Sequence, residues 1–222
     1  DCLLSRGLGD VYKRQEYGRP IADHGMTLAP GDAVFVDLNG DGVLNGDDAT
    51  RDIGFTDIPE YTAGLNLGFS WKNFDFSMQW TGAWNVDRML SEFRRPLGDT
   101  NSKALLLYQY ETTWRSSEDT FTAKFPRASN SHASNNYRGT DLYLINASYL
   151  RLKNVEIGYN FDFPFMKKMK LDNCRLYING YNLLTITGFD WGDPESRQSD
   201  RPNYPLTRVF NICLLYTSPS PR

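Results

Sequence analysis

Residues 61–84 read YTAGLNLGFSWKNFDFSMQWTGAW and contain the clearest secondary-structure signal of the chain. Apolar and polar residues alternate in two arms, which a very short turn at Lys72 and Asn73 separates. Alternation with a period of two places successive side chains on opposite faces of a β-strand. Each arm has about ten residues, the length that a tilted strand needs to cross a bilayer, whereas strands of soluble sheets more often have about five or six. The stretch therefore predicts a membrane-spanning β-hairpin.

The same alternation assigns the side chains of the hairpin to two faces, one toward lipid and one toward the lumen of a barrel. The side chains expected to face lipid are Leu65, Leu67, Phe69, Phe74, Phe76 and Met78. Those expected to face the lumen are Asn66, Ser70, Asp75, Ser77 and Gln79. Aromatic residues near the strand ends fit the girdles that mark the edges of a membrane. These are Trp71, Trp80, Trp84 and Tyr159.

The composition of the 222 residues supports an all-β protein. Aromatic residues make up 14% of the chain. No stretch approaches the roughly 18 consecutive apolar residues that a membrane-spanning helix requires. A barrel strand needs no such run, because its apolar residues alternate with polar ones. The net charge of −3 argues against a nucleic-acid partner, which a clustered basic surface would bind.

Both ends of the chain look foreign to the rest. Residues 1–15 (DCLLSRGLGDVYKRQ) and 213–222 (CLLYTSPSPR) resemble translated sequencing adapters, so we assign the native chain to 16–212 and expect both tails to lack fixed contacts. Two of the three cysteines lie in these tails. Cys174 is then alone, and no disulfide is expected.

Further strand signals follow at 147–161, 175–187 and 204–212. In the first of these segments the apolar residues change phase between Leu152 and Val155, which predicts a β-bulge near Lys153 or Asn154.

The remaining segments read as loops, with short helical pieces at 103–110 and in 162–173. Outer-membrane barrels have short periplasmic turns and long outer loops. We therefore expect three long loops on the extracellular side, at 31–58, 86–140 and 188–203.

Five segments resemble the SusC/RagA family of TonB-dependent outer-membrane transporters, and the likeness runs from about residue 31 to 212. They are GDAVFVDLNGDGVLNGDD (31–48), IPEYTAGLNLGFSWKNFDFSMQWTG (58–82), NASYLRLKNVEIGYNF (146–161), CRLYINGYNLLTITGFDWGDPE (174–195) and YPLTRVFNI (204–212). Their order and spacing match the family. One departure is that the family ordinarily ends its last strand on an aromatic residue, which CLLYTSPSPR replaces here.

The resemblance implies that the chain holds the C-terminal strands of a transmembrane β-barrel of about 22 strands with long extracellular loops. It also implies a plug domain and a TonB-contacting segment outside this chain. The implied place is the outer membrane of a Gram-negative bacterium, where the barrel is surrounded by lipid. The implied partner is a SusD-like lipoprotein, and the implied cargo is an oligosaccharide or a peptide.

Residues 37–48 have oxygen-bearing side chains at the spacing of a calcium-binding loop, with Gly42 at the position of the tight turn. The loop ends in Asp where an EF-hand has Glu, and its flanks are β-like, which is closer to a dockerin-type or barrel-loop site. The candidate ligands are Asp37, Asn39, Asp41, Val43 through its carbonyl, Asn45 and Asp48. The alternative is a polar hairpin turn whose Asn-Gly and Asp-Gly steps supply positive φ.

Four aromatic residues in the long loops are candidates for stacking on sugar rings. They are Tyr108, Tyr110, Trp114 and Trp191. The alternative is that they pack the loops against one another.

No catalytic residues are assigned, and no cofactor besides the possible calcium is required. His24 and His132 are the only histidines, and no nucleophile elbow, zinc spacing or phosphate loop surrounds them. The carboxylate pair of Asp193 and Glu195 is expected by chance in such acidic loops. The chain is therefore predicted not to be an enzyme. A glycoside hydrolase is a third alternative, and it would require a pair of carboxylates in a cleft.

The main alternative function is a secreted, calcium-stabilised β-sandwich that binds carbohydrate. A sandwich also alternates, but it buries the apolar face of each sheet against a second sheet. We expect residues 16–212 alone to be insoluble, because an exposed apolar face and two open sheet edges favour aggregation.

Overall fold

The computed structural model divides into two compact units, which are described separately. The residues that it describes are 5–8, 22–90, 107–129, 133–162, 173–190, 192–196 and 206–217. Unit 1 comprises Asp1–Asp57, Asp87–Asn146 and Gln198–Arg201, and unit 2 comprises Ile58–Val86, Ala147–Arg197 and Pro202–Arg222.

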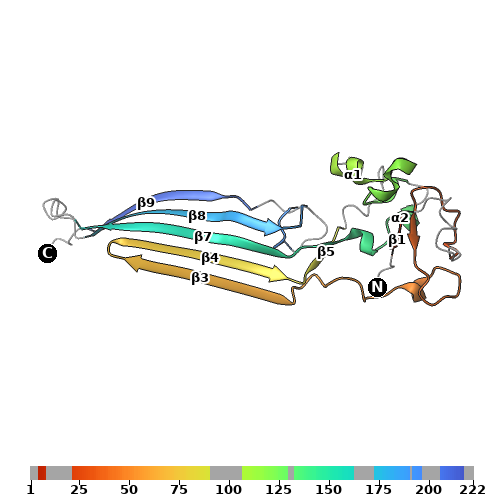
Figure 1. Ribbon diagram of the computed structural model, residues 1–222, viewed down its shortest axis with the longest axis horizontal. Helices are drawn as coiled ribbons and strands as arrows, with labels where there is room; N and C mark the ends of the chain where they lie inside the picture. Colours follow the sequence, from red (N-terminus) through yellow and green to blue (C-terminus); the bar gives the residue numbers. More distant parts are fainter. Residues whose placement is uncertain are drawn as a thin grey trace. The chain divides into compact units, whose positions relative to one another are not determined.

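Unit 2 is a five-stranded antiparallel sheet with the strand order β3-β4-β7-β8-β9 (Figure 1). Its strands are β3 (Tyr61–Trp71), β4 (Phe74–Trp84), β7 (Tyr149–Phe161), β8 (Asn173–Thr187) and β9 (Val209–Thr217). Neighbours in the sheet follow one another along the chain except where unit 1 intervenes between β4 and β7. The predicted all-β, antiparallel fold is confirmed.

The β3–β4 hairpin forms as the alternation predicts. Trp71 pairs with Phe74 across a two-residue turn, and eleven residue pairs continue the register without a shift as far as Tyr61 and Trp84. Lys72 in the turn has a φ of 55°, the left-handed conformation that tight hairpin turns require. Opposite residues share a face, so the two apolar sets of the arms merge into one surface.

The predicted bulge is present in β7. Leu152 pairs with Leu184 and Asn154 pairs with Tyr181, so Lys153 has no partner in the ladder with β8. The structure adds a feature that the sequence analysis missed. Two residues of β8 lie opposite the bulge without Cα partners, and one of them, Asn182, has a φ of 54°.

The last strand begins and ends later than predicted. It starts at Val209 rather than 204, because Asn182 leaves the ladder immediately after the pair of Tyr181 with Val209. It continues to Thr217, so the prediction that both tails lack fixed contacts is wrong for 213–217. It is also wrong for 5–8, which form β1 (Ser5–Leu8) and pair with β2 (Ala33–Phe35). Backbone hydrogen bonds need no particular side chains, and LLYT prolongs the alternation of β9.

Unit 1 consists of short elements. They are β1, β2, the β5 (Asp87–Met89) and β6 (Leu144–Asn146) pair, the helices α1 (Leu107–Thr112) and α2 (Ala133–Asn136), and 3-10 turns at Gly46–Asp48, Ser117–Phe121 and Asp141–Tyr143. Its apolar core is a small cluster of Ala22, Ala33, Phe35 and Leu44. The predicted helix at 103–110 is seen from Leu107 onward, and 101–106 and 163–172 lie outside the described residues.

Among the described residues, no helix has the length and apolar character needed to cross a membrane. Cys174 and Cys213 are both free thiols.

Candidate functional site

One face of the unit 2 sheet is a continuous apolar surface. A row of five apolar side chains crosses all the strands through successive pairs, Phe69, Phe76, Ile157, Ile178 and Ile212. Neighbouring rows on this face add Leu67, Met78, Val155 and Phe210, and Trp71, Phe74, Tyr159, Leu176 and Leu214.

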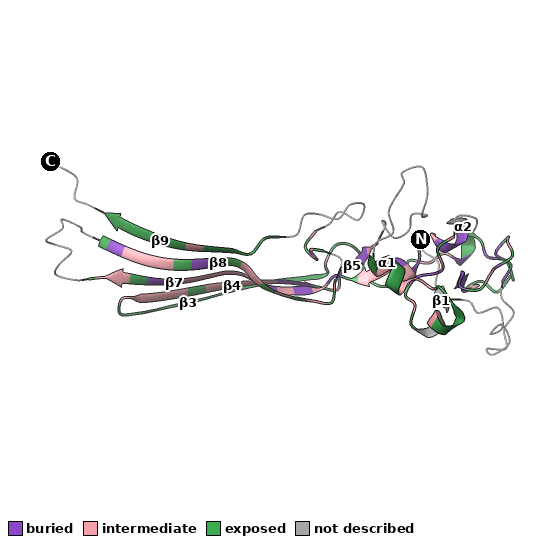
Figure 2. Ribbon diagram, turned by 90° about the horizontal axis from the view of Figure 1, so that it is seen from above, coloured by how far each residue is buried: buried purple, intermediate pink, exposed green. Residues whose placement is uncertain are grey.

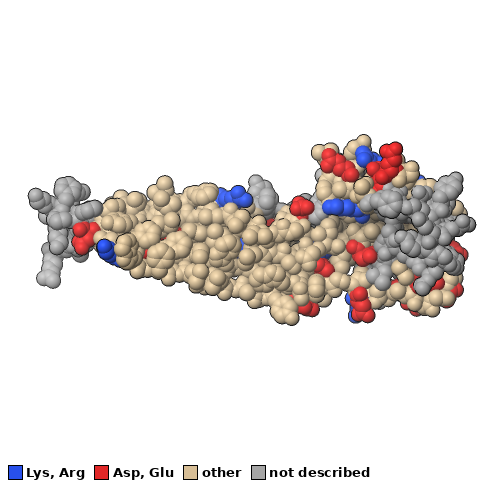
Figure 3. Space-filling model, viewed as in Figure 1, with Lys and Arg blue, Asp and Glu red and all other residues tan. Residues whose placement is uncertain are grey.

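Most of these apolar side chains are exposed, and the half-buried ones are Phe74, Phe76, Met78, Val155 and Leu176. Phe69 is 57% exposed, Ile178 49% and Ile212 74%. Exposure extends along the edge strands β3 and β9 (Figure 2). Charged side chains are sparse over the middle of the sheet surface seen in Figure 3. A monomer in water rarely exposes so wide an apolar face. We therefore expect this surface to be covered by another protein or by an apolar medium.

The opposite face of the same sheet is polar. Its rows pair Asn66 with Gln79 and Asn154, and Gly68 with Ser77, Glu156, Asn179 and Asn211. The amide of Asn211 donates to Asn179 at 2.8 Å across β8 and β9. The hairpin residues predicted to face a lumen thus share one face, and those predicted to face lipid share the other.

An ion cluster crosses three strands of the polar face. Arg175 of β8 donates to Glu156 of β7 at 2.8 Å and forms an ion pair with Asp75 of β4, two strands away. Gly158 lies between them, and a Cβ there would come within 2.5 Å of both the guanidinium and the Asp75 carboxylate. The missing side chain is therefore what lets Arg175 reach across β7.

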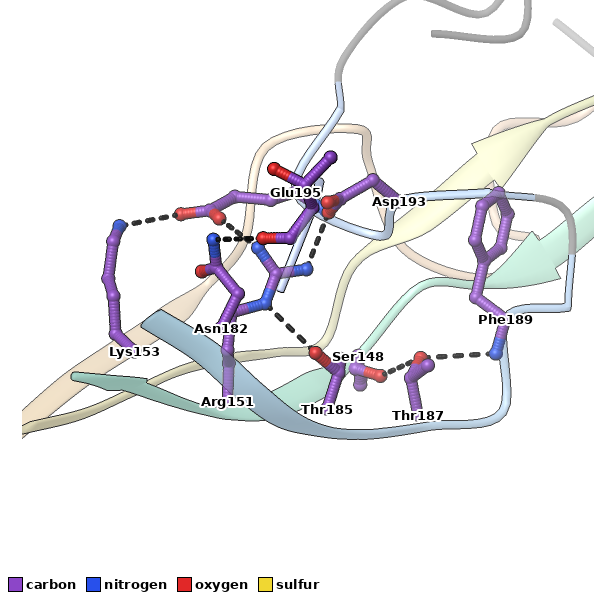
Figure 4. Close-up of polar contacts among 10 residues, drawn as sticks. Ser148, Arg151, Lys153, Asn182, Thr185, Thr187, Phe189, Asp193 and Glu195 are labelled. Atoms are coloured by element: carbon purple, nitrogen blue, oxygen red, sulfur yellow. Dashed lines mark hydrogen bonds and ion pairs between the residues drawn. The ribbon is translucent and has the colours of Figure 1, made fainter. Parts of the chain in front are cut away.

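A second cluster centres on Arg151 of β7, whose side chain is only 3% exposed (Figure 4). Its Nη2 donates to Asp193 at 2.7 Å, its Nη1 to Glu195 at 2.6 Å, and its Nε to the Thr185 hydroxyl at 3.1 Å. The carboxylate pair that the sequence analysis attributed to chance therefore has a role in holding the segment after β8 to the sheet.

The predicted calcium loop closes on itself through its own carboxylates. Asp48 is fully buried and accepts hydrogen bonds from the backbone N–H groups of Leu38 and Asn45, both at 2.9 Å. Asp37 accepts from Gly40 at 2.6 Å and from Gly42 at 2.8 Å. The hydrogen bond from Asn45 is the main reason that the pKa of Asp48 is lowered.

The remaining predicted ligands lie in the same loop. Asn39 accepts from the N–H of Asp41 at 2.9 Å, Asp41 accepts from Val43 at 2.8 Å, and Asn45 accepts from Asp47 at 2.6 Å. Within the described ranges, no three His, Cys, Asp or Glu side chains are arranged to hold a metal ion. Calcium binding stays a prediction.

The aromatic candidates divide into packed and exposed residues. The Trp114 ring lies against Gly31, where a Cβ would come within 2.1 Å of it, and Tyr108 packs edge-on against Phe125 at 6.4 Å. Tyr110 is 51% exposed. Trp191 lies outside the described residues.

Arg115 lies over the exposed ring of Tyr110, 5.0 Å from its centroid. Its hydrogen bonds to Tyr110 and Asp119 raise its pKa. Tyr110 is thus the most exposed of the described candidates, and Tyr108, half-buried, also has a cation over its ring, Lys124 at 5.5 Å from the centroid.

A buried polar network in unit 1 was missed by the sequence analysis. Asp32 is fully buried and accepts from Arg127 at 2.7 Å, from Asn136 at 2.9 Å and from the Ala29 N–H at 2.7 Å. Asn136 in turn accepts from the Ala33 N–H at 3.1 Å. The partners are up to 104 residues apart, so no local pattern could have linked them.

Comparison with known proteins finds relatives in sequence. No protein-family model matches the chain. The chain is similar to TonB-dependent receptor P3 of Formosa agariphila, at 32% identity over 93% of this chain and 21% of the relative. It is also similar to TonB-dependent receptor P26 of the same organism, at 29% identity over 86% of this chain and 19% of the relative. The chain thus spans about a fifth of the length of these curated relatives.

Solved structures share the fold. The RagAB peptide transporter matches 83% of this chain and 21% of its own with a TM-score of 0.63 at 21% identity. The RagAB peptide importer in its closed-closed state matches 87% of this chain and 20% of its own with a TM-score of 0.60 at 22% identity.

Proposed function

We propose that the chain, which belongs to the TonB-dependent receptors, contributes strands and loops to an outer-membrane β-barrel that imports large nutrients with energy from TonB. The two faces of the unit 2 sheet carry this proposal. The apolar face contacts lipid, and the polar face lines the lumen through which cargo passes.

The strand lengths fit this role. β3 and β4 have 11 residues each, which at about 3.4 Å per residue and a tilt of about 45° rise roughly 26 Å. The apolar band of an outer-membrane barrel is about 25 Å tall. The apolar face, which is exposed in the isolated chain, would be covered by lipid in the membrane.

The cargo and the partner follow from the resemblance and from the solved relatives. We propose that the cargo is an oligosaccharide or a peptide and that a SusD-like lipoprotein assembles with the barrel. The RagAB structures are those of a peptide transporter and importer, which supports the peptide reading. The exposed ring of Tyr110 supports the sugar reading, because sugar C–H faces stack on aromatic rings.

We propose further that the loop 37–48 binds calcium weakly on the outer side of the membrane. Its oxygen spacing and the positive φ of Gly40 and Gly42 support this proposal. Binding would require Asp37 and Asp41 to exchange backbone N–H partners for the ion. Titration calorimetry on the full-length transporter tests it, and an unchanged calcium signal in Asp37→Ala and Asp41→Ala would remove the site.

The lipid assignment is tested by a matched pair of substitutions in β3. Leu67→Arg places a charge on the apolar face near the middle of the strand, and we expect a cost of about 2–4 kcal/mol in the bilayer. Asn66→Arg places the same charge one residue away on the polar face, where the cost should be small. The measurement is the fraction of full-length protein that resists unfolding on unheated gels after outer-membrane fractionation.

Two outcomes contradict the proposal. Equal effects of the two substitutions would show that the faces are not in different solvents. A water-soluble, monodisperse and cooperatively melting monomer of residues 16–212 would instead favour the secreted carbohydrate-binding sandwich.

A further inference from the structure

The Arg151 cluster has two carboxylate arms that differ in exposure. Asp193 is 8% exposed, and its Oδ1 also accepts the backbone N–H of Glu195 at 2.9 Å, so it is part of the turn itself. The Glu195 side chain is 36% exposed, and its second oxygen meets the Lys153 ammonium at 3.4 Å (Figure 4). One carboxylate is thus fixed, and the other is held at the surface by two cations.

The Glu195 arm is the easier one to release. The Lys153 side chain is 44% exposed, and ion pairs between exposed groups contribute only about 0–1 kcal/mol. Arg151 differs, because its guanidinium is buried. Without Glu195 its Nη1 loses an acceptor, while its Nη2 stays paired with Asp193. A departing Glu195 therefore leaves a preorganised cationic site behind it.

Polar atoms beside the cluster add to this site. Thr81 is paired with Arg151 in the sheet, and its hydroxyl is buried without a hydrogen-bond partner within the described residues. The same holds for the side-chain oxygen of Asn154, the residue after the bulge. Buried polar groups are almost always paired, so such atoms point to a ligand or water at this place.

The bulge changes which polar side chain accompanies the two cations. Lys153 of β7 has no partner in the ladder with β4 or in the ladder with β8. Arg151, Lys153 and Asn154 therefore lie close together at the bulge. A regular strand would place Arg151 and Lys153 on one face and Asn154 on the other. The register shift instead puts Asn154 opposite Gln79, on the same face as Arg151 opposite Thr81.

We infer that Arg151 and Lys153 form a carboxylate-binding site on the polar face, which Glu195 occupies as an internal ligand and which an anionic group of the cargo takes over. The substrate class is a carboxylate-bearing molecule, either an acidic sugar or a peptide with a free carboxylate. As a statement about cargo, this rests on the proposed import function. The binding site itself does not.

The experiment is a calorimetric titration of the full-length transporter in detergent with glucuronate, with glucose as the neutral matched probe. In Glu195→Gln the internal competitor is gone, and glucuronate should bind about tenfold more tightly than in the unaltered protein. Glucose should bind equally to both. An acetylated dipeptide as acid and as amide then separates the peptide source of the carboxylate from the sugar source.

Two further variants keep the test sharp. Lys153→Gln, which leaves the buried Arg151 in place, should weaken glucuronate binding to Glu195→Gln by several-fold when the two changes are combined. Glu118→Gln removes one exposed carboxylate from unit 1 and should change nothing. The inference is overturned if Glu195→Gln binds glucuronate no better than Glu118→Gln, or if glucose gains as much as glucuronate. These titrations need neither TonB nor a membrane. Their results can therefore be interpreted even if the import proposal fails.

Discussion

Units 1 and 2 use their side chains in opposite ways. Unit 1 buries a charged residue, Asp32, together with apolar side chains such as Phe35 and Tyr143. Unit 2 leaves large apolar residues such as Phe69 and Ile212 exposed, and its strands are joined by an almost unbroken ladder. Burial of apolar side chains therefore does not stabilise both units in the same way. Irregular backbone needs side-chain partners for its N–H and C=O groups, whereas sheet backbone satisfies them itself.

The largest expected effect comes from removing the buried anion of unit 1. Asp32→Ala removes the carboxylate that accepts from Arg127 and Asn136, of which Asn136 keeps the Arg127 carbonyl as an acceptor. Breaking a buried ion pair from one side costs about 3–5 kcal/mol. Hydrogen exchange of the full-length protein should report loss of protection in unit 1 and none in the unit 2 strands β3, β4, β7, β8 and β9. Asp52→Ala, at an exposed position, is the control and should cost about 0.5 kcal/mol or less. Equal loss in both units would mean that they are not independently stabilised.

The next effect targets the sheet. Gly158→Val inserts a side chain where Arg175 and Asp75 meet, and overpacking of this kind costs about 1–3 kcal/mol. The urea midpoint of the folded full-length protein on unheated gels measures it. The matched control is Gly64→Val, because a Cβ at Gly64 meets nothing closer than 3.9 Å. If both substitutions have the same effect, the ion cluster is not what requires a glycine at 158.

A smaller effect concerns the left-handed residue opposite the bulge. Asn182 has a φ of 54°, so Asn182→Val should cost about 1–2 kcal/mol and Asn182→Gly should be nearly neutral. The same gel assay applies. A larger loss for the glycine variant would show that the Asn182 side chain, which donates to the Thr207 carbonyl at 3.3 Å, matters more than its backbone.

The smallest effect is a pH dependence in unit 1. The pKa of Asp48 is lowered in the folded protein, so its contribution to stability is complete above the ordinary value of about 3.9 and is lost as the pH falls below it. Protection of the Leu38 and Asn45 amides, corrected for intrinsic exchange, should therefore hold from pH 7 to about 4 and then decline. In Asp48→Asn the decline should be absent. A loss of protection already at pH 6 would assign the transition to another group.

The sheet could be predicted largely from sequence because its signals are local. Alternation located β3 and β4 to the residue, and a phase change predicted a bulge near Lys153 or Asn154, where the structure has one at Lys153. The similarity to TonB-dependent receptors also follows from these segments and is confirmed. The end of β9 was misjudged because a segment of foreign appearance can still pair through its backbone.

The sites could be predicted only in part because they join distant segments. The loop 37–48 was visible as a spacing of oxygens, whereas Asp32 meets partners near residues 127 and 136. Arg151 meets carboxylates more than 40 residues away, and Gly158 acquires its role only when β4 and β8 flank it. Neither relation leaves a periodic trace in the chain. The sequence could not predict which aromatic loop residues are exposed, because this depends on how the loops pack.

The two-residue turn at Lys72 also bears on the order in which the sheet assembles. β3 and β4 meet across this turn alone, so their pairing closes a minimal loop, and hairpins of this kind form in about 1–10 μs. β4 and β7 must wait until the chain from 85 to 148 has been brought back, at an additional entropic cost that grows with the logarithm of loop length. We therefore expect the hairpin to be the nucleus on which β7, β8 and β9 add in turn.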